Sequence, residues 1–82
     1  MQQEERDRTL LAILEPEDRH KIDEVVDDII ADDLATVDEA NLEGAAAAFD
    51  LRADGLPDEE KVVAWQIAAA LRQRASQTLG LH

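Results

Sequence analysis

The apolar residues of this chain recur at intervals of three and four along the sequence, and this spacing constrains the fold more than any other feature. The segment after Pro16 shows the pattern most clearly, with apolar residues at Ile22, Val25, Val26, Ile29 and Ile30. This spacing places apolar side chains on one face of an α-helix, whereas a half-buried strand requires alternation at every second residue. The sequence shows no such alternation and therefore predicts an all-α fold.

Prolines and a capping pattern mark where the helices begin. Pro16 and Pro57 suit the first position of a helix, and both are followed by acidic residues, which the positive N-terminal end of a helix favours. Thr36 and Glu39 form a capping-box pattern in which Thr36 caps a third helix and Glu39 bonds back to it. These positions predict helix starts near residues 16, 37 and 57.

The helix ends are indicated by residues that suit neither a core nor a continuing helix. Asp33 falls within the apolar arc of the second helix, and a buried carboxylate is costly, so this helix should end or bend near residues 31–33. Asp54–Gly55 indicates a turn in which Gly55 adopts a positive φ. We expect a small three- to four-helix bundle in one domain, residues 1–82, with helices at about 3–14, 16–32, 37–53 and 57–79.

The same periodicity predicts which side chains are buried. Leu10, Ile13 and Leu14 share one face of the first helix, and the third helix should bury Leu42, Ala45, Ala46 and Phe49. The fourth helix should bury an apolar stripe formed by Ala64, Ile67, Ala68, Leu71, Ala75 and Leu79. Gly44 weakens the third helix by about 1 kcal/mol relative to alanine, unless close packing uses the missing side chain.

Composition limits the functions open to the chain. It has 82 residues and no cysteine, which excludes disulfides, thiolate metal sites and cysteine nucleophiles. No apolar run approaches the roughly 18–20 residues that a membrane span needs. The N-terminal segment MQQEERDRTL is charged and unlike a targeting peptide. We expect a cytoplasmic protein without a membrane partner.

The charge is strongly negative and unevenly distributed. The net charge is −12, with −15 on residues 1–60 and +3 on residues 61–82. Phosphate contacts require basic groups, so nucleic acid and anionic membranes are disfavoured as partners. A basic protein partner is compatible with this charge.

The second helix is expected to carry an acidic face. Its members are spaced as like-charge neighbours, which cost a few tenths of a kcal/mol per pair; they are Asp23, Glu24, Asp27, Asp28 and Asp32. One interpretation is a docking face for a basic partner. The other is an acidic surface that reflects a salt-adapted organism or a GC-rich genome.

The fourth helix is expected to carry a surplus apolar patch at Val62, Trp65 and Ala69. The stripe through Ile67 and Leu71 suffices to dock this helix, and monomers seldom leave a large apolar patch in water. The patch therefore predicts an interface, with a homodimer as the first choice. In the alternative interpretation, Phe49 and Leu11 bury Trp65 within one chain.

Two fragments resemble metal-binding motifs in part. Glu17 and His20 form one Glu-x-x-His pair, of the kind that di-metal helical bundles use twice. Residues 50–55 resemble the start of an EF-hand loop, but Arg52 stands where an oxygen ligand is needed and Lys61 where a bidentate glutamate is needed. We expect no metal, and a metal-dependent activity rests on Glu17 and His20 alone.

Catalysis by a nucleophile is equally unsupported by the sequence. Ser76 is the single serine, and it has no acid or histidine close to it in sequence. There is no glycine-rich phosphate loop. We expect no catalytic residue, no cofactor and no enzymatic activity.

The sequence thus favours a non-enzymatic protein–protein interaction module, such as an adaptor, a regulator or a small subunit of an assembly. The alternative is a DNA mimic that occupies the nucleic-acid groove of a basic protein. Acids at positions 23, 24, 27, 28, 32 and 33 present about one charge per 2.5 Å of helix axis. One DNA strand presents one charge per ~3.4 Å, so the density is compatible with mimicry.

Overall fold

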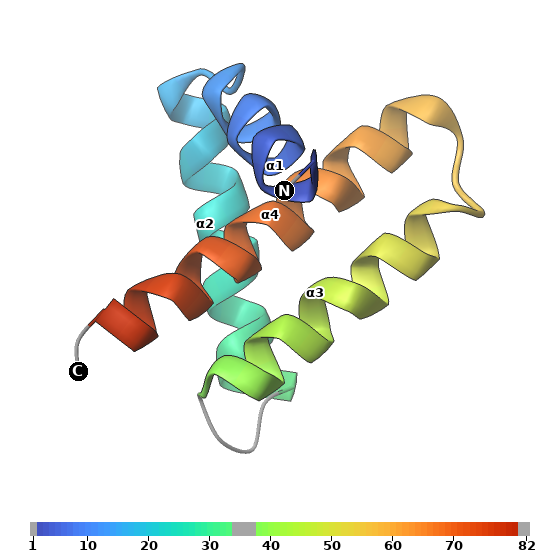
Figure 1. Cartoon of the computed structure of the whole chain (residues 1–82). Coiled ribbons are helices and arrows are strands. Elements are labelled where there is room, and N and C mark those ends of the chain that lie inside the picture. Colours follow the sequence, from blue (N-terminus) through green and yellow to red (C-terminus); the bar gives the residue numbers. More distant parts are fainter. Residues whose placement is uncertain (1, 34–37, 81–82) are drawn as a thin grey trace.

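The computed structural model describes residues 2–33 and 38–80, and the side chains of residues 5–32 and 38–77. Within these ranges the chain forms four helices and no strand, which confirms the predicted all-α fold (Figure 1). The helices are α1 (Gln2–Ala12), α2 (Pro16–Asp33), α3 (Glu39–Ala53) and α4 (Asp58–Gly80).

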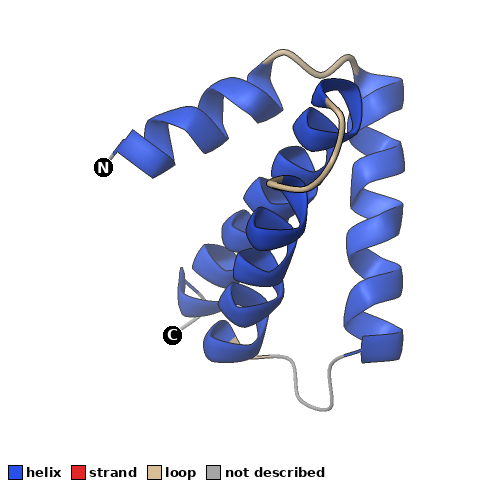
Figure 2. Ribbon diagram, turned by 90° about the vertical axis from the view of Figure 1, so that its right-hand side faces the viewer, coloured by secondary structure: helices blue, strands red, loops and turns tan. Residues whose placement is uncertain are grey.

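The helices form two hairpins, α1–α2 and α3–α4, and both helices of the first hairpin pack against α4. The helices α3 and α4 run antiparallel and pack closely along their length (Figure 1). The helices α1 and α2 diverge from the turn that joins them, and each separately contacts α4 (Figures 1 and 2). Because α1 and α2 lean apart, the surface of α4 between them is left partly open.

The composition of α4 explains its central position. Ala68, Ala69 and Ala70 point in three different directions around the helix, yet all three are buried. Their small side chains allow neighbouring helices to approach closely. Of the predicted stripe, Ala64, Ile67, Ala68, Leu71 and Ala75 are buried, and Leu79 lies outside the described side chains. The prediction that this helix is buried on several sides is confirmed.

The core is completed by two buried side chains each from α2 and α3. Leu42 and Ala46 of α3 and Ile22 and Val26 of α2 are buried against α4. Partly buried side chains surround this cluster; they are Leu11, Leu14, Ile29, Ile30, Ala45 and Phe49. The apolar periodicity therefore identified most of the core.

The N-terminal cap of α3 differs from the prediction. Asp38 is the cap, and its carboxylate accepts a hydrogen bond from the backbone N–H of Asn41 at 2.8 Å. The helix consequently begins at Glu39, two residues later than expected. Thr36, the predicted cap, lies outside the described residues. The Asp38 side chain bonds to the backbone N–H three residues later, as the predicted Thr36 cap would, and aspartate is as good a cap as threonine.

The turn after α3 also differs from the prediction, because no glycine among the described residues has a positive φ. Instead, the backbone N–H groups of Asp54, Gly55 and Leu56 each bond to the carbonyl three residues earlier, at 3.3, 3.2 and 3.0 Å. These bonds tighten the end of the helix into a right-handed turn and satisfy its last carbonyls. A left-handed glycine is therefore not required here.

Candidate interaction surfaces

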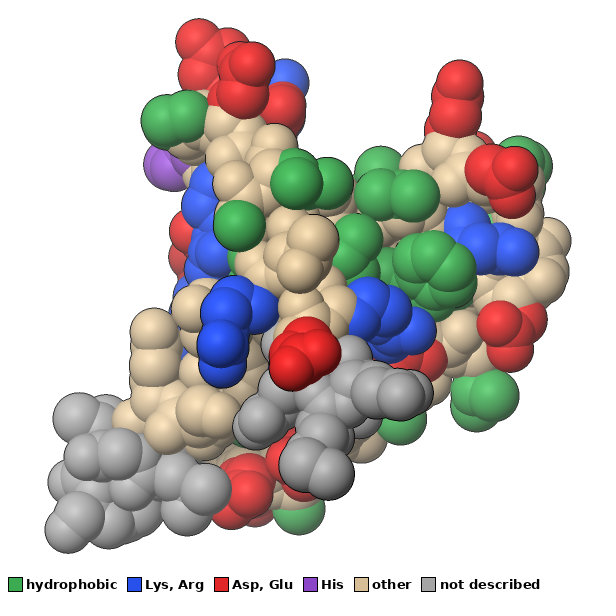
Figure 3. Space-filling view, turned by 45° about the horizontal axis from the view of Figure 1, so that its top comes forward, with side chains coloured by type: hydrophobic (Ala, Val, Ile, Leu, Met, Phe, Trp, Pro, Cys, Tyr) green, Lys and Arg blue, Asp and Glu red, His purple; other side chains and the backbone are tan. Residues whose placement is uncertain are grey.

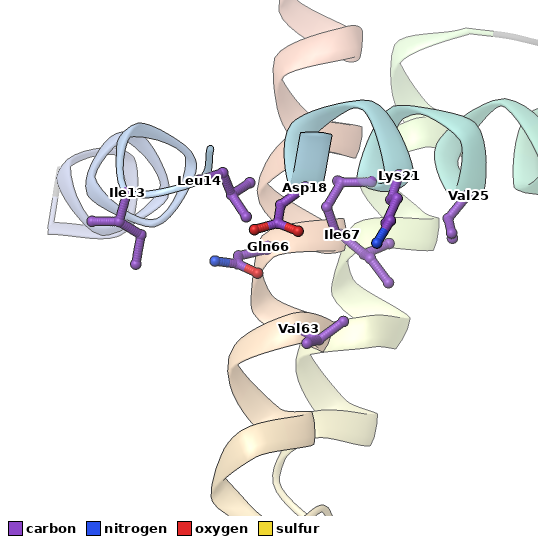
Figure 4. A pocket seen from close by; sticks show the side chains of 9 residues that line it. Ile13, Leu14, Asp18, Lys21, Val25, Val63, Gln66 and Ile67 are labelled. Atoms are coloured by element: carbon purple, nitrogen blue, oxygen red, sulfur yellow. The ribbon is translucent and has the colours of Figure 1, made fainter. Parts of the chain in front are cut away.

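An apolar groove lies between α2 and the turn after α1, with α4 as its floor. It has a volume of about 520 Å³ and is lined mainly by apolar side chains of this turn, of α2 and of α4. Figure 4 shows Ile13 and Leu14 on one side, Val25 on the opposite side, and Val63 and Ile67 along α4. The groove therefore draws its walls from three separate segments of the chain.

Three of these apolar side chains are exposed to solvent. Ile13 is 64% exposed, Val63 is 47% exposed and Val25 is 38% exposed. Membership of an apolar helix face, which the periodicity predicts for Ile13 and Val25, therefore does not bury either side chain. Ile13 lies beyond the end of α1 at Ala12, and no described element covers the edge of α2 that carries Val25. Periodicity places a side chain on the inner face of its helix, but it does not reveal that two helices diverge.

The polar groups of the groove are few and are held in place. The Gln66 side chain is buried, and its Nε2 donates a hydrogen bond to the backbone carbonyl of Leu10 at 3.3 Å. This bond ties α4 to the last turn of α1. Asp18 and Lys21 lie on the α2 side of the groove (Figure 4). The floor is therefore mainly apolar, its Gln66 amide is engaged by α1, and one carboxylate and one ammonium group lie on the rim.

The predicted acidic face of α2 is divided in the structure. Asp23 pairs with Arg19 at 3.2 Å, and Asp27 pairs with Arg74 of α4 at 3.0 Å. Arg19 also donates a hydrogen bond to the side chain of Gln73 on α4. Asp23 and Asp27 thus lie on the α4 side of α2, where Arg19 of α2 and Arg74 of α4 offset their charge.

The other three predicted acids lie on the outer side of α2. Glu24, Asp28 and Asp32 are exposed, and Glu24 lies 3.0 Å from His20. His20, one of the two residues of the Glu-x-x-His pair, thus has the Glu24 carboxylate as a neighbour. The outer acidic face consists of Glu24, Asp28 and Asp32, and we use this name for these three residues.

The predicted apolar patch on α4 is smaller than expected. Ala69 is 1% exposed, so it is buried within the chain and offers no area to a partner. Val62 and Trp65 are half-buried. The guanidinium of Arg6 lies 5.2 Å from the centre of the Trp65 ring, and the ammonium of Lys61 lies 6.0 Å from it. The homodimer through this patch remains a prediction, with less apolar area to support it.

An ion-pair cluster that sequence reasoning missed joins three helices. Arg72 of α4 donates to both carboxylate oxygens of Asp7 on α1, at 2.5 and 2.8 Å, and to Asp50 on α3 at 2.8 Å. Arg6 lies 3.6 Å from the second oxygen of Asp50. The hydrogen bond to Asp7 is the main reason that the pKa of Arg72 lies above its usual value, and the bond to Asp50 adds to the effect although burial opposes it.

This cluster includes Asp50, the first residue of the EF-hand-like segment at residues 50–55. Asp50, which would be the first ligand, is held by Arg72. Within residues 2–33 and 38–80, no three histidine, aspartate or glutamate side chains gather in a way that could hold a metal ion. None of the helices in the same ranges is long and apolar enough to cross a membrane.

Two surfaces are therefore open to a partner: the apolar groove and the outer acidic face. On the side of the molecule seen in Figure 3, acidic side chains stand at the projecting tips and apolar side chains gather between them. Comparison of the chain with protein families, with curated proteins and with solved structures found no match.

Proposed function

We propose that this protein is a non-enzymatic interaction module that binds a basic region of a partner protein. The observation that supports this proposal is the different placement of cationic and acidic side chains in the fold. Most of the cations are engaged in contacts within the chain, whereas most of the carboxylates face solvent. The solvent-facing surface therefore presents mainly carboxylates to a partner.

Six of the eight lysines and arginines contact other side chains of the same chain. Arg19, Arg72 and Arg74 pair with carboxylates, and Arg6, Arg52 and Lys61 lie over aromatic rings. The acids whose charge is offset by these ion pairs are Asp7, Asp23, Asp27 and Asp50.

The exposed acids are distributed over all four helices. Asp28 and Asp32 lie on the outer acidic face, and Glu59 and Glu60 lie in the first turn of α4. Such a surface attracts a basic partner at long range and raises the rate of encounter. It also repels nucleic acid and other acidic proteins, which narrows the class of partner.

Charge reversal on the outer acidic face tests this proposal. The protein, immobilised at low salt and exposed to an extract of its host, should retain a basic protein that elutes as salt approaches about 0.5 M, because screening weakens such contacts. Asp28→Lys with Asp32→Lys should abolish retention of that protein. The matched control is Asp54→Lys with Asp58→Lys, which reverses two exposed acids at the turn between α3 and α4 and should retain it.

Two results would contradict the proposal. One is retention that is equal for both reversal variants, and the other is capture of acidic or neutral proteins alone. A retained nucleic-acid-binding protein that is displaced by duplex DNA would point to the DNA-mimic alternative. The ion pairs of Asp23 and Asp27 weaken that alternative, because they reduce the run of free charges along α2.

A further inference from the structure

We propose that the apolar groove formed by the turn after α1, α2 and α4 binds one amphipathic helix of a partner protein, with the apolar face of that helix on α4 and its basic side chains at the rim. This inference rests on the proposed function, since it assumes a basic partner, and it adds where that partner binds and in what conformation. It is argued from the exposure of the groove, from its backbone and from the charges around it.

The exposed apolar side chains of the groove indicate that it is covered by another apolar surface. Ile13, Val25 and Val63 come from three segments and are each more than one-third exposed, yet they surround one hollow of about 520 Å³. Isolated exposed apolar residues are ordinary on a protein surface, but a contiguous group around a hollow marks a binding site. The buried side chains of Ile22 and Ile67 continue the apolar surface inward.

The backbone of the walls favours a helix over an extended peptide. An extended peptide needs partners for its own N–H and C=O groups, which a sheet edge provides. The walls here are two α-helices, whose backbone groups bond within each helix, and a turn in which the N–H groups of Ile13 and Leu14 bond back to α1. A bound helix satisfies its own backbone and needs only apolar contact with the groove, so its binding leaves no buried polar group unpaired.

The charges near the groove favour a basic occupant over a second copy of this chain. Glu59 and Glu60 precede Val63 by one helical turn, Asp28 follows Val25 by one turn, and Asp18 lines the groove itself. Lys21 offsets part of this charge. A second copy would bring another net charge of −12 to the same surface, which opposes self-association.

The inference is tested with synthetic helical peptides as probes. The first has about 18 residues, five turns of helix, with leucines at helical spacing on one face and lysines elsewhere. The second has the same composition in scrambled order, and the third replaces every lysine with glutamate. In calorimetric titrations, we expect the first peptide to bind one-to-one and at least tenfold more tightly than the scrambled one, and the glutamate peptide not to bind.

Variants of the protein locate the binding site. Ile13→Ser with Val63→Ser should weaken binding of the first peptide at least tenfold, because both side chains line the groove. Leu51→Ser is the matched control: Leu51 is 75% exposed on α3, does not line the groove, and should leave binding unchanged. Circular dichroism checks the fold, and Val25→Ser alone replaces the double variant where that variant loses helicity.

The outcomes separate this inference from the proposed function. One outcome is that the amphipathic and scrambled peptides bind equally, and that Asp28→Lys with Asp32→Lys abolishes this binding whereas the groove variants do not. That outcome overturns the groove as the binding site but leaves the acidic docking face supported. Loss of binding in the groove variants alone supports the groove. A dimer of the protein that Ile13→Ser with Val63→Ser disperses would show that the occupant is a second copy and would also overturn the inference.

Discussion

Arg72 shows how one side chain can hold the two hairpins of this fold together. It reaches Asp7 of α1 with a bidentate contact and Asp50 of α3 with its remaining nitrogen. The side chains of Arg72 and Asp7 are 18% and 12% exposed, so water screens these contacts weakly. The geometry requires the planar guanidinium, which a lysine does not supply.

We therefore predict that Arg72→Met destabilises the protein by about 2–3 kcal/mol. Breaking a fully buried ion pair costs roughly 3–5 kcal/mol, and the residual exposure here reduces that loss. Urea denaturation followed by circular dichroism measures the change. As a control, Arg52→Met removes an arginine that lies over the Phe49 ring on the surface and should cost less than about 1 kcal/mol. Similar losses for both variants would show that the cluster adds no stability of its own.

Gly44 lies in the middle of α3 without a packing reason for glycine. A Cβ built at this position meets no atom within 4 Å, so the close approach that would justify glycine is absent. Gly44→Ala should raise the free energy of unfolding by about 0.5–1 kcal/mol, because alanine loses less backbone entropy on folding. Ala48→Gly, one turn later on the same exposed side, should lower it by a similar amount. A loss of stability in Gly44→Ala would disprove the argument.

At the scale of the elements, the carboxylate of Asp38 caps α3 and so helps to set where this helix begins. Asp38→Ala should destabilise the protein by about 1 kcal/mol, because the N–H of Asn41 loses its acceptor. Asp38→Ser should retain most of the stability. Asp54→Ala changes an acid at the opposite end of α3, where the helix dipole disfavours negative charge, and should be neutral or slightly stabilising. Thermal melts of the three variants decide the order.

The helices could be predicted from the sequence because their start and stop residues act locally. Pro16 begins α2 as expected, and α2 ends at Asp33, where a carboxylate would enter the apolar arc. The apolar groove could not be predicted, because the exposure of Ile13 and Val25 depends on the angle between two helices. The Arg72 cluster joins positions 65 residues apart. Its one sequence indication is an arginine placed among the buried alanines and leucine of α4.

At the scale of the whole molecule, the unbalanced charge should make stability depend on salt. At 0.01 M salt the Debye length is about 30 Å, which is comparable to the molecular dimensions of 35 × 27 × 23 Å. Each acid then interacts with nearly every other acid. Raising NaCl to about 0.15 M shortens this length to roughly 8 Å and should raise the melting temperature by a few degrees.

A variant with fewer charges provides the control for this salt effect. Asp28→Asn with Asp32→Asn removes two exposed charges and should show a higher melting temperature at low salt and a smaller rise with added NaCl. A melting temperature that is constant or falls with salt would mean that the ion pairs of Arg19, Arg72 and Arg74 outweigh the repulsion.

Self-association through Trp65 is governed by the same balance between charge and apolar area. With Ala69 buried, Val62 and Trp65 are the members of the patch that a second chain could cover. Two copies each carrying −12 repel one another at low salt, and two cations of the same chain already lie over the Trp65 ring. We therefore predict a monomer near 0.01 M salt and a dimer near 1 M, where the Debye length is about 3 Å. Light scattering across this range measures the mass.

Trp65→Glu should abolish the dimer while the helical circular dichroism persists, because the ring is only half-buried. Leu51→Glu, an exposed site on α3, should leave the dimer intact. A monomer at every salt concentration, or a dimer strongest at low salt, would refute the prediction.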